Sequence, residues 1–391
     1  DDAGFETEVY NNSVVHTPHL RSLARHSVVF RNAFTSVSSC SPSRSAILTG
    51  LPQSLPLLLN QANIHTGIIG KKHVGPGSVY PFDFAYTEEN NSVLQVGRNI
   101  TRIKLLVRKF FQTHKAEAAE RRRVRGEGIS SNPKEEEEER PFFLYVAFHD
   151  THRCGHLQPQ YGAFCEKFGN GETGMGTIPD WTPVYYTPEQ VKELRDAGYE
   201  NDTLIIYSSD NGIPFPNGRT NLYQSGTAEP MLVSSPEHRE RWGDTSQAYV
   251  SLLDITPTIL DWFSIPYPSY SLPESPSLQV LLTGRSLLPA LTSEPSSWIT
   301  VYSSQSLHEV TMYYPIRSIQ QGAYHLLHNL HYRMPFPIDQ DLYVSPTFQD
   351  LLNRTRLQQP THWFKSLDQY YYRERWELYD TRSVMLPAPE N

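Results

Sequence analysis

Three short apolar runs, each followed at once by polar and glycine-containing residues, constrain the fold of this chain more than any other feature. They lie at residues 66–71, 141–150 and 203–212. Their apolar residues are continuous, not alternating, which predicts strands covered on both faces, as in a mostly parallel sheet flanked by helices. In such sheets the chemistry gathers at the carboxyl ends of the strands. The sequence therefore predicts an α/β fold with its functional residues where these runs end.

Polar residues with useful chemistry follow each run. Lys71 and His73 come after the first, a histidine-containing segment over 149–156 closes the second, and Asp210 and Asn211 close the third. Side chains two residues apart on an extended segment point the same way, so we expect Lys71 and His73 to share one face. We expect the ends of the three runs to meet in one site.

The chain has room for two domains. Its 391 residues suffice for one large α/β domain and a smaller one. From about Pro315 short runs flank a turn at Gly322, which predicts an antiparallel hairpin. We expect a catalytic domain over 1–312 and a smaller, truncated C-terminal α+β domain with an antiparallel sheet over 313–391. Helices are expected over 17–26, 43–49 and 248–263.

Residues 113–140 differ in composition from the rest of the chain. A basic cluster around Arg123 is followed by an acidic run over 135–139, with almost no apolar residues between them. Such a segment cannot bury enough apolar surface to offset the entropy of ordering. Charge blocks of this kind predict a solvated, disordered insertion.

The charge and hydropathy of the chain exclude two classes of partner. The net charge is −8, and no basic stripe of the size needed for nucleic acid is present. The longest apolar run, 142–148, is too short to span a bilayer. We therefore expect neither nucleic acid nor a membrane as a partner, and any anion-binding site must be a local pocket.

Cys40 opens the string Cys-Ser-Pro-Ser-Arg, which has the pattern of a nucleophile that faces an anion. Pro42 suits the first turn of a helix, where a missing N–H is no loss. A helix N-terminus offers free backbone donors and partial positive charge, and Arg44 adds a fixed fork for two oxygens. The alternative is a buried cysteine at a helix start with an arginine on the surface.

Two pairs of oxygen donors predict a site for a hard divalent cation. Asp1 and Asp2 form one pair, and Asp210 and Asn211 form the other. All-oxygen ligands favour Ca²⁺ over Zn²⁺. Taken alone, each pair could be an ordinary turn, because Asp, Asn and Gly are common turn residues.

The segment that contains His149, His152, Cys154 and His156 permits a zinc site, but its spacings match no common zinc pattern. We therefore reject zinc and expect His149 and His156 to pack or to form hydrogen bonds. Cys154 and Cys165 are close enough in sequence to close a small loop, which would leave Cys40 as the unpaired cysteine among three.

These motifs resemble those of the sulfatase family. Cys40 to Arg44, followed by Leu-Thr-Gly at 48–50, is similar to the signature in which the cysteine is oxidised after translation to Cα-formylglycine, whose hydrate is the nucleophile. Gly70 to His73 is similar to the second sulfatase signature. The resemblance implies an alkaline-phosphatase-like sulfatase fold and a Ca²⁺ ion.

The resemblance also implies a role for each candidate residue. Cys40 becomes the nucleophile, and His152 protonates the leaving group. The sulfate oxygens are neutralised by Arg44, Lys71, His73 and Arg219, and the metal ligands are Asp1, Asp2, Cys40, Asp210 and Asn211.

Longer segments narrow the resemblance to one branch, the sulfamidases, which remove the N-linked sulfate from the non-reducing-end glucosamine of heparan sulfate. They lie at 30–53, 155–181, 213–223 and 334–355. This branch implies a heparan sulfate oligosaccharide as substrate, a formylglycine-generating enzyme as maturation partner, a homodimer and a lysosomal location reached through the secretory pathway. Sequons compatible with that route lie at Asn11, Asn90, Asn99, Asn201 and Asn353.

Two other functions stay open at this point. The chain could be another sulfatase or a related hydrolase that acts on O-sulfate or phosphate esters, because nothing local separates N-sulfate from O-sulfate cleavage. Cys40, in place of a serine or threonine, disfavours the phosphatase. From a different class, the chain could be a catalytically inactive, truncated glycoprotein that binds glycosaminoglycan.

Overall fold

The computed structural model describes most of the chain. The residues that it leaves out are 5–6, 14–15, 51–52, 89–95, 98, 125–139, 150–151, 153–188, 214–217, 267–268, 273–274, 281–282, 309–311, 339–342, 344, 362, 364 and 385–391. The expected loop between Cys154 and Cys165, the histidine His156 and the sequon at Asn90 therefore lie outside the described residues.

The first sheet of the large domain has the strand order β7-β8-β1-β9. The strands are β1 Val28–Phe34, β7 Ile205–Ser208, β8 Ala228–Ser234 and β9 Thr245–Ser251. β1 is parallel to β9, whereas β8 is antiparallel to both β1 and β7. The run at 203–212 thus forms β7, and three of these four strands share one direction.

The second sheet of this domain is parallel throughout. Its order is β5-β4-β6, with β4 at His65–Gly70, β5 at Phe84–Thr87 and β6 at Phe142–Ala147. The runs at 66–71 and 141–150 form β4 and β6. Together the two sheets confirm the predicted α/β class, with β8 as the strand that runs against the rest.

The two sheets belong to one layer, because their facing strands β6 and β7 supply the same two hydrophobic clusters. Phe143 and Ile206 pack against one cluster, and Leu144 and Ile205 pack against the other. A cavity of about 1270 Å³ lies between the two strands and reaches Asp210.

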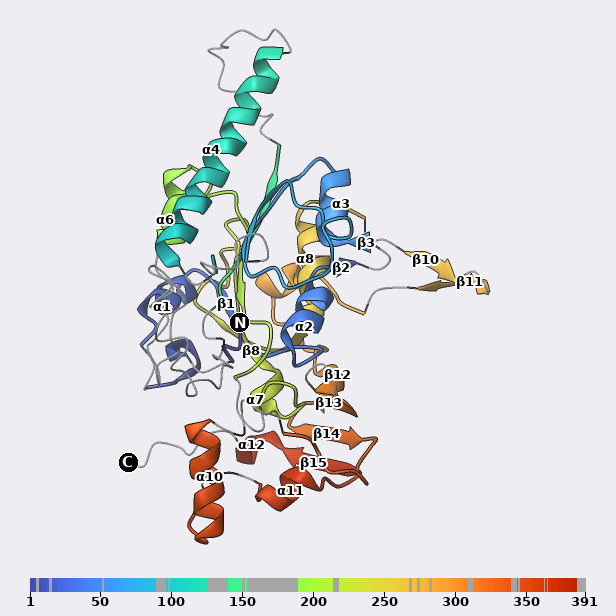
Figure 1. The fold of residues 1–391 in the computed structure, drawn as a ribbon. Helices are drawn as coiled ribbons and strands as arrows, with labels where there is room; N and C mark the ends of the chain where they lie inside the picture. Colours follow the sequence, from blue (N-terminus) through green and yellow to red (C-terminus); the bar gives the residue numbers. More distant parts are fainter. Residues whose placement is uncertain are drawn as a thin grey trace.

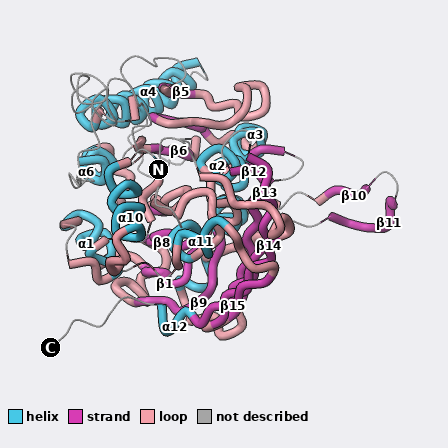
Figure 2. The backbone as a smooth tube through the Cα atoms, turned by 60° about the horizontal axis from the view of Figure 1, so that its bottom comes forward, coloured by secondary structure: helices cyan, strands magenta, loops and turns pink. Residues whose placement is uncertain are grey.

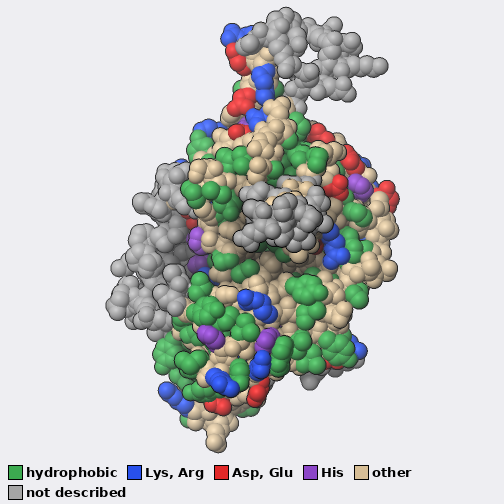
Figure 3. Space-filling view, turned by 90° about the vertical axis from the view of Figure 1, so that its right-hand side faces the viewer, with side chains coloured by type: hydrophobic (Ala, Val, Ile, Leu, Met, Phe, Trp, Pro, Cys, Tyr) green, Lys and Arg blue, Asp and Glu red, His purple; other side chains and the backbone are tan. Residues whose placement is uncertain are grey.

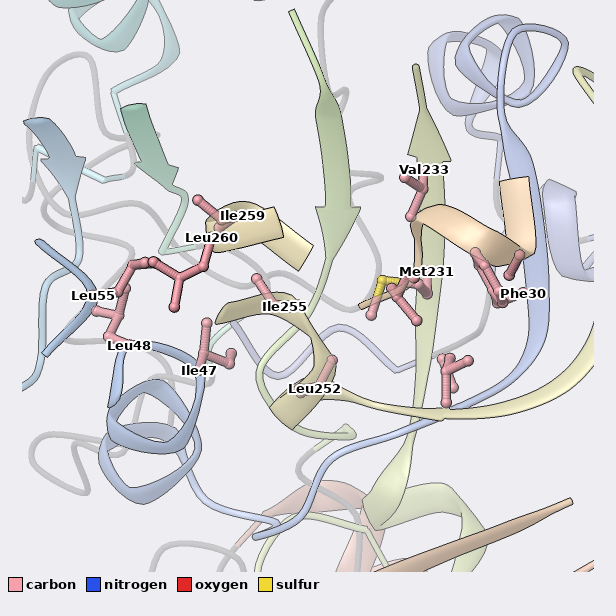
Figure 4. Packing of buried hydrophobic residues seen from close by; sticks show 14 of the residues in the cluster. Phe30, Ile47, Leu48, Leu55, Met231, Val233, Leu252, Ile255, Ile259 and Leu260 are labelled. Carbon is pink, nitrogen blue, oxygen red and sulfur yellow. The ribbon is translucent and has the colours of Figure 1, made fainter. Parts of the chain in front are cut away.

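Helices cover both faces of this layer (Figure 1). On one face lie α2 Cys40–Ile47, α3 Leu55–Gln61, η4 Leu252–Asp254 and α8 Ile255–Trp262; on the other lie α1 Pro18–Ala24, α4 Ile100–Val124 and α6 Glu189–Asp196. Ile47 at the end of α2 packs with Leu252 and Ile255, as Figure 4 shows. This packing holds the first turn of α2 beside the ends of the strands.

Helix α4 contradicts part of the predicted disorder over 113–140. The helix has 25 residues and continues to Val124. His114 and Ala118 are buried on its inner face, and Arg123 forms an exposed ion pair with Glu120 one turn earlier. The prediction of disorder relied on the many charged residues and overlooked this amphipathic pattern. A few buried side chains at helical spacing are enough to pack the helix against the rest of the domain.

The C-terminal part contains the predicted antiparallel sheet. Its strands β12 Thr300–His308, β13 Met312–Gln321, β14 Tyr324–Asn329 and β15 Trp376–Asp380 lie side by side in this order (Figure 2). β13 and β14 are the hairpin expected around Gly322. The sheet begins at Thr300, before the boundary expected at 313. Helices α10 Pro346–Arg356, α11 Leu367–Tyr371 and α12 Thr381–Val384 accompany it.

The remaining elements are short. They are η1 Glu8–Tyr10, β2 Thr49–Gly50, β3 Gln53–Ser54, α7 Gln224–Thr227, β10 Tyr270–Leu272, β11 Ser275–Val280 and η5 Leu288–Leu291. Across the described part of the chain, no helix combines the length and apolar character needed to cross a membrane.

Candidate active site

The ends of the strands and the start of α2 bring most of the predicted residues together. Asp210 and Asn211 follow β7, Lys71 follows β4, and Cys40 is the first residue of α2. All four are buried, with Cys40 only 1% exposed. The parallel pairing of β4 with β6 brings Lys71 to the carboxyl edge of that sheet, and Arg44 joins Lys71 to Asp210 after β7.

Three carboxylates lie close together at this point. Asp1, Asp2 and Asp210 each offer an oxygen, and these atoms lie within 4.8 Å of one another. Asn211 Nδ2 donates to Asp2 Oδ1 at 2.7 Å. Its Oδ1 is buried and lacks a hydrogen-bond partner among the described residues. Clustered carboxylates and an unsatisfied amide oxygen are the donor set that a hard cation such as Ca²⁺ requires.

Arg44, on α2, connects this helix to the carboxylate cluster. Its Nε donates to Asp210 Oδ2 at 2.8 Å, and its Nη1 donates to the backbone oxygen of Lys71 at 2.7 Å. Burial alone would raise the pKa of Asp210, but Arg44 and Lys71 outweigh it and hold that pKa well below its usual range. Asp210 is therefore ionised, as a metal ligand must be.

Cys40 is buried and forms no disulfide with any residue that the structure describes. Its Sγ lies 3.6 Å from Asp2 Oδ1. Burial, with added repulsion from Asp2 and Asp210, raises the pKa of the Cys40 thiol. A thiol reacts as its thiolate, so the unmodified side chain in this setting is a weak nucleophile.

Lys71 and His73 differ from the expected arrangement. Lys71 is buried, and its Nζ donates to Asp1 Oδ2. His73 is exposed, and its backbone is in the left-handed region with φ of 48°. The segment is therefore not extended through residue 73, and the two side chains do not share one face in this structure.

His152 and Arg219 both approach Asp2. His152 Nε2 lies 3.9 Å from Asp2 Oδ2, and Arg219 Nε lies 3.6 Å from Asp2 Oδ1. Burial would raise the pKa of Asp2, but His152 and Arg219 together hold it below its ordinary value. The site thus contains buried carboxylates with basic side chains close beside them.

Two residues near the site were not predicted from the sequence. Tyr145, on β6, has its hydroxyl 3.4 Å from Arg44 Nη1. Glu88 binds His149 Nδ1 at 2.8 Å, which confirms the hydrogen-bonding role expected for that histidine. Glu88 directly follows β5, so the rule that polar residues end parallel strands would have found it if β5 had been predicted.

Comparisons with known proteins identify the class. The family described as Sulfatase matches residues 1–265. Because this match covers more than half of the chain, the chain belongs to the sulfatase family.

A particular relative stands out within that family. The chain is 61% identical to N-sulphoglucosamine sulphohydrolase of Homo sapiens, over 97% of this chain and 82% of that protein. Arylsulfatase A of Homo sapiens is 25% identical over 76% of this chain and 69% of its own length.

Solved structures agree on the fold. A structure of BT4656 in complex with its substrate D-glucosamine-2-N,6-O-disulfate matches with a TM-score of 0.60 at 15% identity, over 98% of this chain and 90% of that chain. A structure of Ps i-CgsB in complex with k-i-k-neocarrahexaose matches with a TM-score of 0.57 at 19% identity, over 94% of both chains.

Proposed function

We propose that this chain is a sulfamidase, which hydrolyses the N-linked sulfate of non-reducing-end N-sulfoglucosamine during heparan sulfate degradation. The observation that carries the proposal is the 61% identity to human N-sulphoglucosamine sulphohydrolase across 97% of this chain. The geometry supports it, because a buried cysteine at a helix start lies in one cluster with carboxylates and cations.

In this proposal the cations of the cluster bind the sulfate group. Arg44, Lys71 and Arg219 are held on carboxylates by ion pairs, so their charges are in place before substrate arrives. Groups fixed in this way stabilise the charge that develops on sulfate oxygens without reorganising during the reaction. We assign His73 to the same group, and its exposed side chain is accessible to a substrate.

Two groups that the family uses fit the residues that are present. Ca²⁺ would be held by Asp1, Asp2, Asp210, Asn211 and the side chain at Cys40, and it would add positive charge beside the sulfate oxygens. Formylglycine at position 40, once hydrated, supplies one hydroxyl oxygen for sulfur and a second hydroxyl that permits release of sulfate. Asn211 Oδ1, which has no hydrogen-bond partner within the described part of the chain, and the proximity of Cys40 to Asp2 support this assignment.

His152 would give a proton to the glucosamine nitrogen as the N–S bond breaks. Its approach to Asp2 places the ring at the same cluster as the nucleophile. A histidine is readily protonated at mildly acidic pH, which suits this role in a lysosome. The net reaction adds one water across the N–S bond and yields sulfate and the amine.

The remaining expectations are part of the same proposal. We infer a heparan sulfate oligosaccharide as substrate, maturation by a formylglycine-generating enzyme, a lysosomal location and a homodimer.

An exposed apolar face supports the proposed dimer. Apolar side chains gather over the C-terminal sheet in the lower part of Figure 3. Tyr302 and Leu378 on this sheet are 66% and 65% exposed, and exposed apolar faces of this kind favour protein contacts.

The test is sulfate release from N-sulfoglucosamine by protein secreted from eukaryotic cells, at acidic pH. The matched control substrate is N-acetylglucosamine 6-O-sulfate, which carries an O-sulfate on the same sugar. We expect release from the N-sulfated sugar only. Release from the O-sulfated sugar instead would assign the chain to the O-sulfatases, and release from neither would contradict the proposal.

A further inference from the structure

The loop that carries Arg219 is anchored in the C-terminal domain. Leu222 and Tyr223, just after Arg219, are buried in the same hydrophobic cluster as Phe336 and Tyr370 of that domain. The C-terminal domain is thus in direct contact with a loop whose arginine reaches Asp2.

A polar contact reinforces this anchor. Arg373 lies between α11 and β15 and is only 3% exposed. Its Nη2 donates to Asn221 Oδ1 at 2.8 Å, and its Nε donates to the backbone oxygen of Tyr370 at 3.1 Å. Its guanidinium lies 3.5 Å from the centre of the Phe336 ring. A planar guanidinium that is stacked on an aromatic ring has little freedom to move, so it can hold the side chain of Asn221 in a fixed position.

Asn221 transmits this restraint to Arg219. It is 1% exposed, and its Nδ2 lies 3.5 Å from the backbone oxygen of Arg219. The backbone N–H of Arg219 donates to Ile213, two residues beyond the metal-site residue Asn211. Arg219 is therefore held on both sides, by the segment after β7 and by the C-terminal domain.

The residue between Arg219 and Asn221 has a strained backbone conformation. Thr220 has φ of 68°, a conformation that is unfavourable for a β-branched residue and persists only where its surroundings impose it. Its N–H donates to Ser38 at 2.6 Å, close to Cys40 in the chain. The contact with Ser38 fixes one end of the turn, and the bond from Arg373 to Asn221 fixes the other.

We propose that Arg373 is a positioning residue that holds the loop over 218–223 so that Arg219 points into the sulfate site. The inference rests on the proposed function, because it gives Arg219 the role of binding a sulfate oxygen. Arg373 itself belongs to the C-terminal core, so it acts through Asn221 and Arg219.

Two variants remove the same bond from opposite ends, Arg373→Met and Asn221→Ala. For each we would measure kcat/KM for N-sulfoglucosamine and, by calorimetry, the affinity for inorganic sulfate. A lost hydrogen bond to a charged group corresponds to about tenfold or more. We expect both quantities to fall by about that factor, with the affinity for Ca²⁺ unchanged. If one variant fails to fold, the other carries the test.

A control separates positioning from loss of stability. Leu351 is buried against Phe348 and Leu367, a cluster of the C-terminal domain that contains no residue of the loop. Leu351→Ala should lower the melting temperature and leave kcat/KM and sulfate affinity within about twofold of the parent protein. Equal functional losses in Leu351→Ala and Arg373→Met, at equal loss of melting temperature, would overturn the proposal.

The deciding measurement is made in an Arg219→Ala background. If Arg373 acts through Arg219, adding Arg373→Met to Arg219→Ala changes sulfate affinity by less than about twofold, because coupled residues are not additive. A further loss as large as that in the parent protein would contradict the inference. The affinity for sulfate is measured without any hydrolysis, so the two proposals can fail separately. A parent protein that binds sulfate but does not hydrolyse N-sulfoglucosamine would refute the sulfamidase function alone. A parent protein that does not bind sulfate would refute the positioning role of Arg373.

Discussion

Arg44 donates from Nε to Asp210 Oδ2 at 2.8 Å and so joins the helix that begins at Cys40 to the carboxyl end of β7. Both side chains are about 3% exposed. A buried charge whose partner is removed is strongly destabilising, whereas the intact pair adds little net stability. The pair therefore makes the positions of Cys40 and Asp210, the proposed nucleophile and a proposed metal ligand, depend on each other.

Replacing Arg44 should therefore cost both stability and activity. We expect Arg44→Gln to lower the free energy of unfolding by roughly 3–5 kcal/mol in calcium-free buffer, because the buried carboxylate of Asp210 loses the guanidinium that donates to it. Urea unfolding measures this. The control is Arg195→Gln, which breaks an exposed ion pair with Glu200 and should change the free energy by less than about 1 kcal/mol. Equal effects of the two variants would contradict this reading.

Calcium should stabilise the folded protein. The carboxylates of Asp1, Asp2 and Asp210 lie within 4.8 Å of one another, and a cation that binds only the folded state stabilises it by about 2.7 kcal/mol at a hundred times its Kd. We expect the melting temperature to fall when EGTA is added and to recover with excess Ca²⁺. Asp210→Asn should lose most of this response. If the protein is first shown to contain bound metal and its melting temperature does not change when EGTA is added, the proposed Ca²⁺ site is ruled out.

Gly212 has no room for a side chain. A Cβ at this position would lie 1.9 Å from the backbone oxygen of Ser225, whereas a Cβ at Gly77 would meet no described atom within 4 Å. We expect Gly212→Ala to lower the free energy of unfolding by about 1–3 kcal/mol and to reduce activity, because the preceding residue is Asn211. Gly77→Ala should stay within about 0.5 kcal/mol. Full activity in Gly212→Ala would show that the loop tolerates displacement of Asn211.

The C-terminal sheet should weaken in acid. Burial lowers the pKa of His325 on β14 from its usual value to about 4. The folded state therefore favours neutral His325. Its contribution is complete above an unfolded pKa near 6.5 and is lost, at about 1.4 kcal/mol per pH unit, as the pH falls toward 4.

Urea unfolding at pH 6.5 and pH 5 measures this effect. The parent protein should lose about 1.5 kcal/mol more over this interval than His325→Gln. His331 is exposed on the same domain, so His331→Gln should keep the pH dependence of the parent protein. A His325→Gln protein with the parental pH dependence would mean that another group controls it.

The sequence was most informative where chemistry follows directly from local pattern. Apolar runs that end in polar residues predicted that Lys71, Asp210 and Asn211 would meet, and the structure brings them together with Cys40. It was least informative where tertiary contacts decide. Residues 248–251 were expected in a helix, but they alternate between core and surface and pair with β1 as the end of β9. The contact of Arg373 with Asn221 joins residues 152 positions apart, and no local pattern predicts it.

The most direct test of the proposed chemistry at Cys40 is the mass of the peptide that contains this residue. The protein is secreted by eukaryotic cells and is assayed in parallel for sulfate release from N-sulfoglucosamine. We expect an aldehyde at position 40 in active protein, and neither aldehyde nor activity in Cys40→Ala. Active protein in which residue 40 is entirely unmodified cysteine would contradict it, as would protein that carries the aldehyde and releases no sulfate.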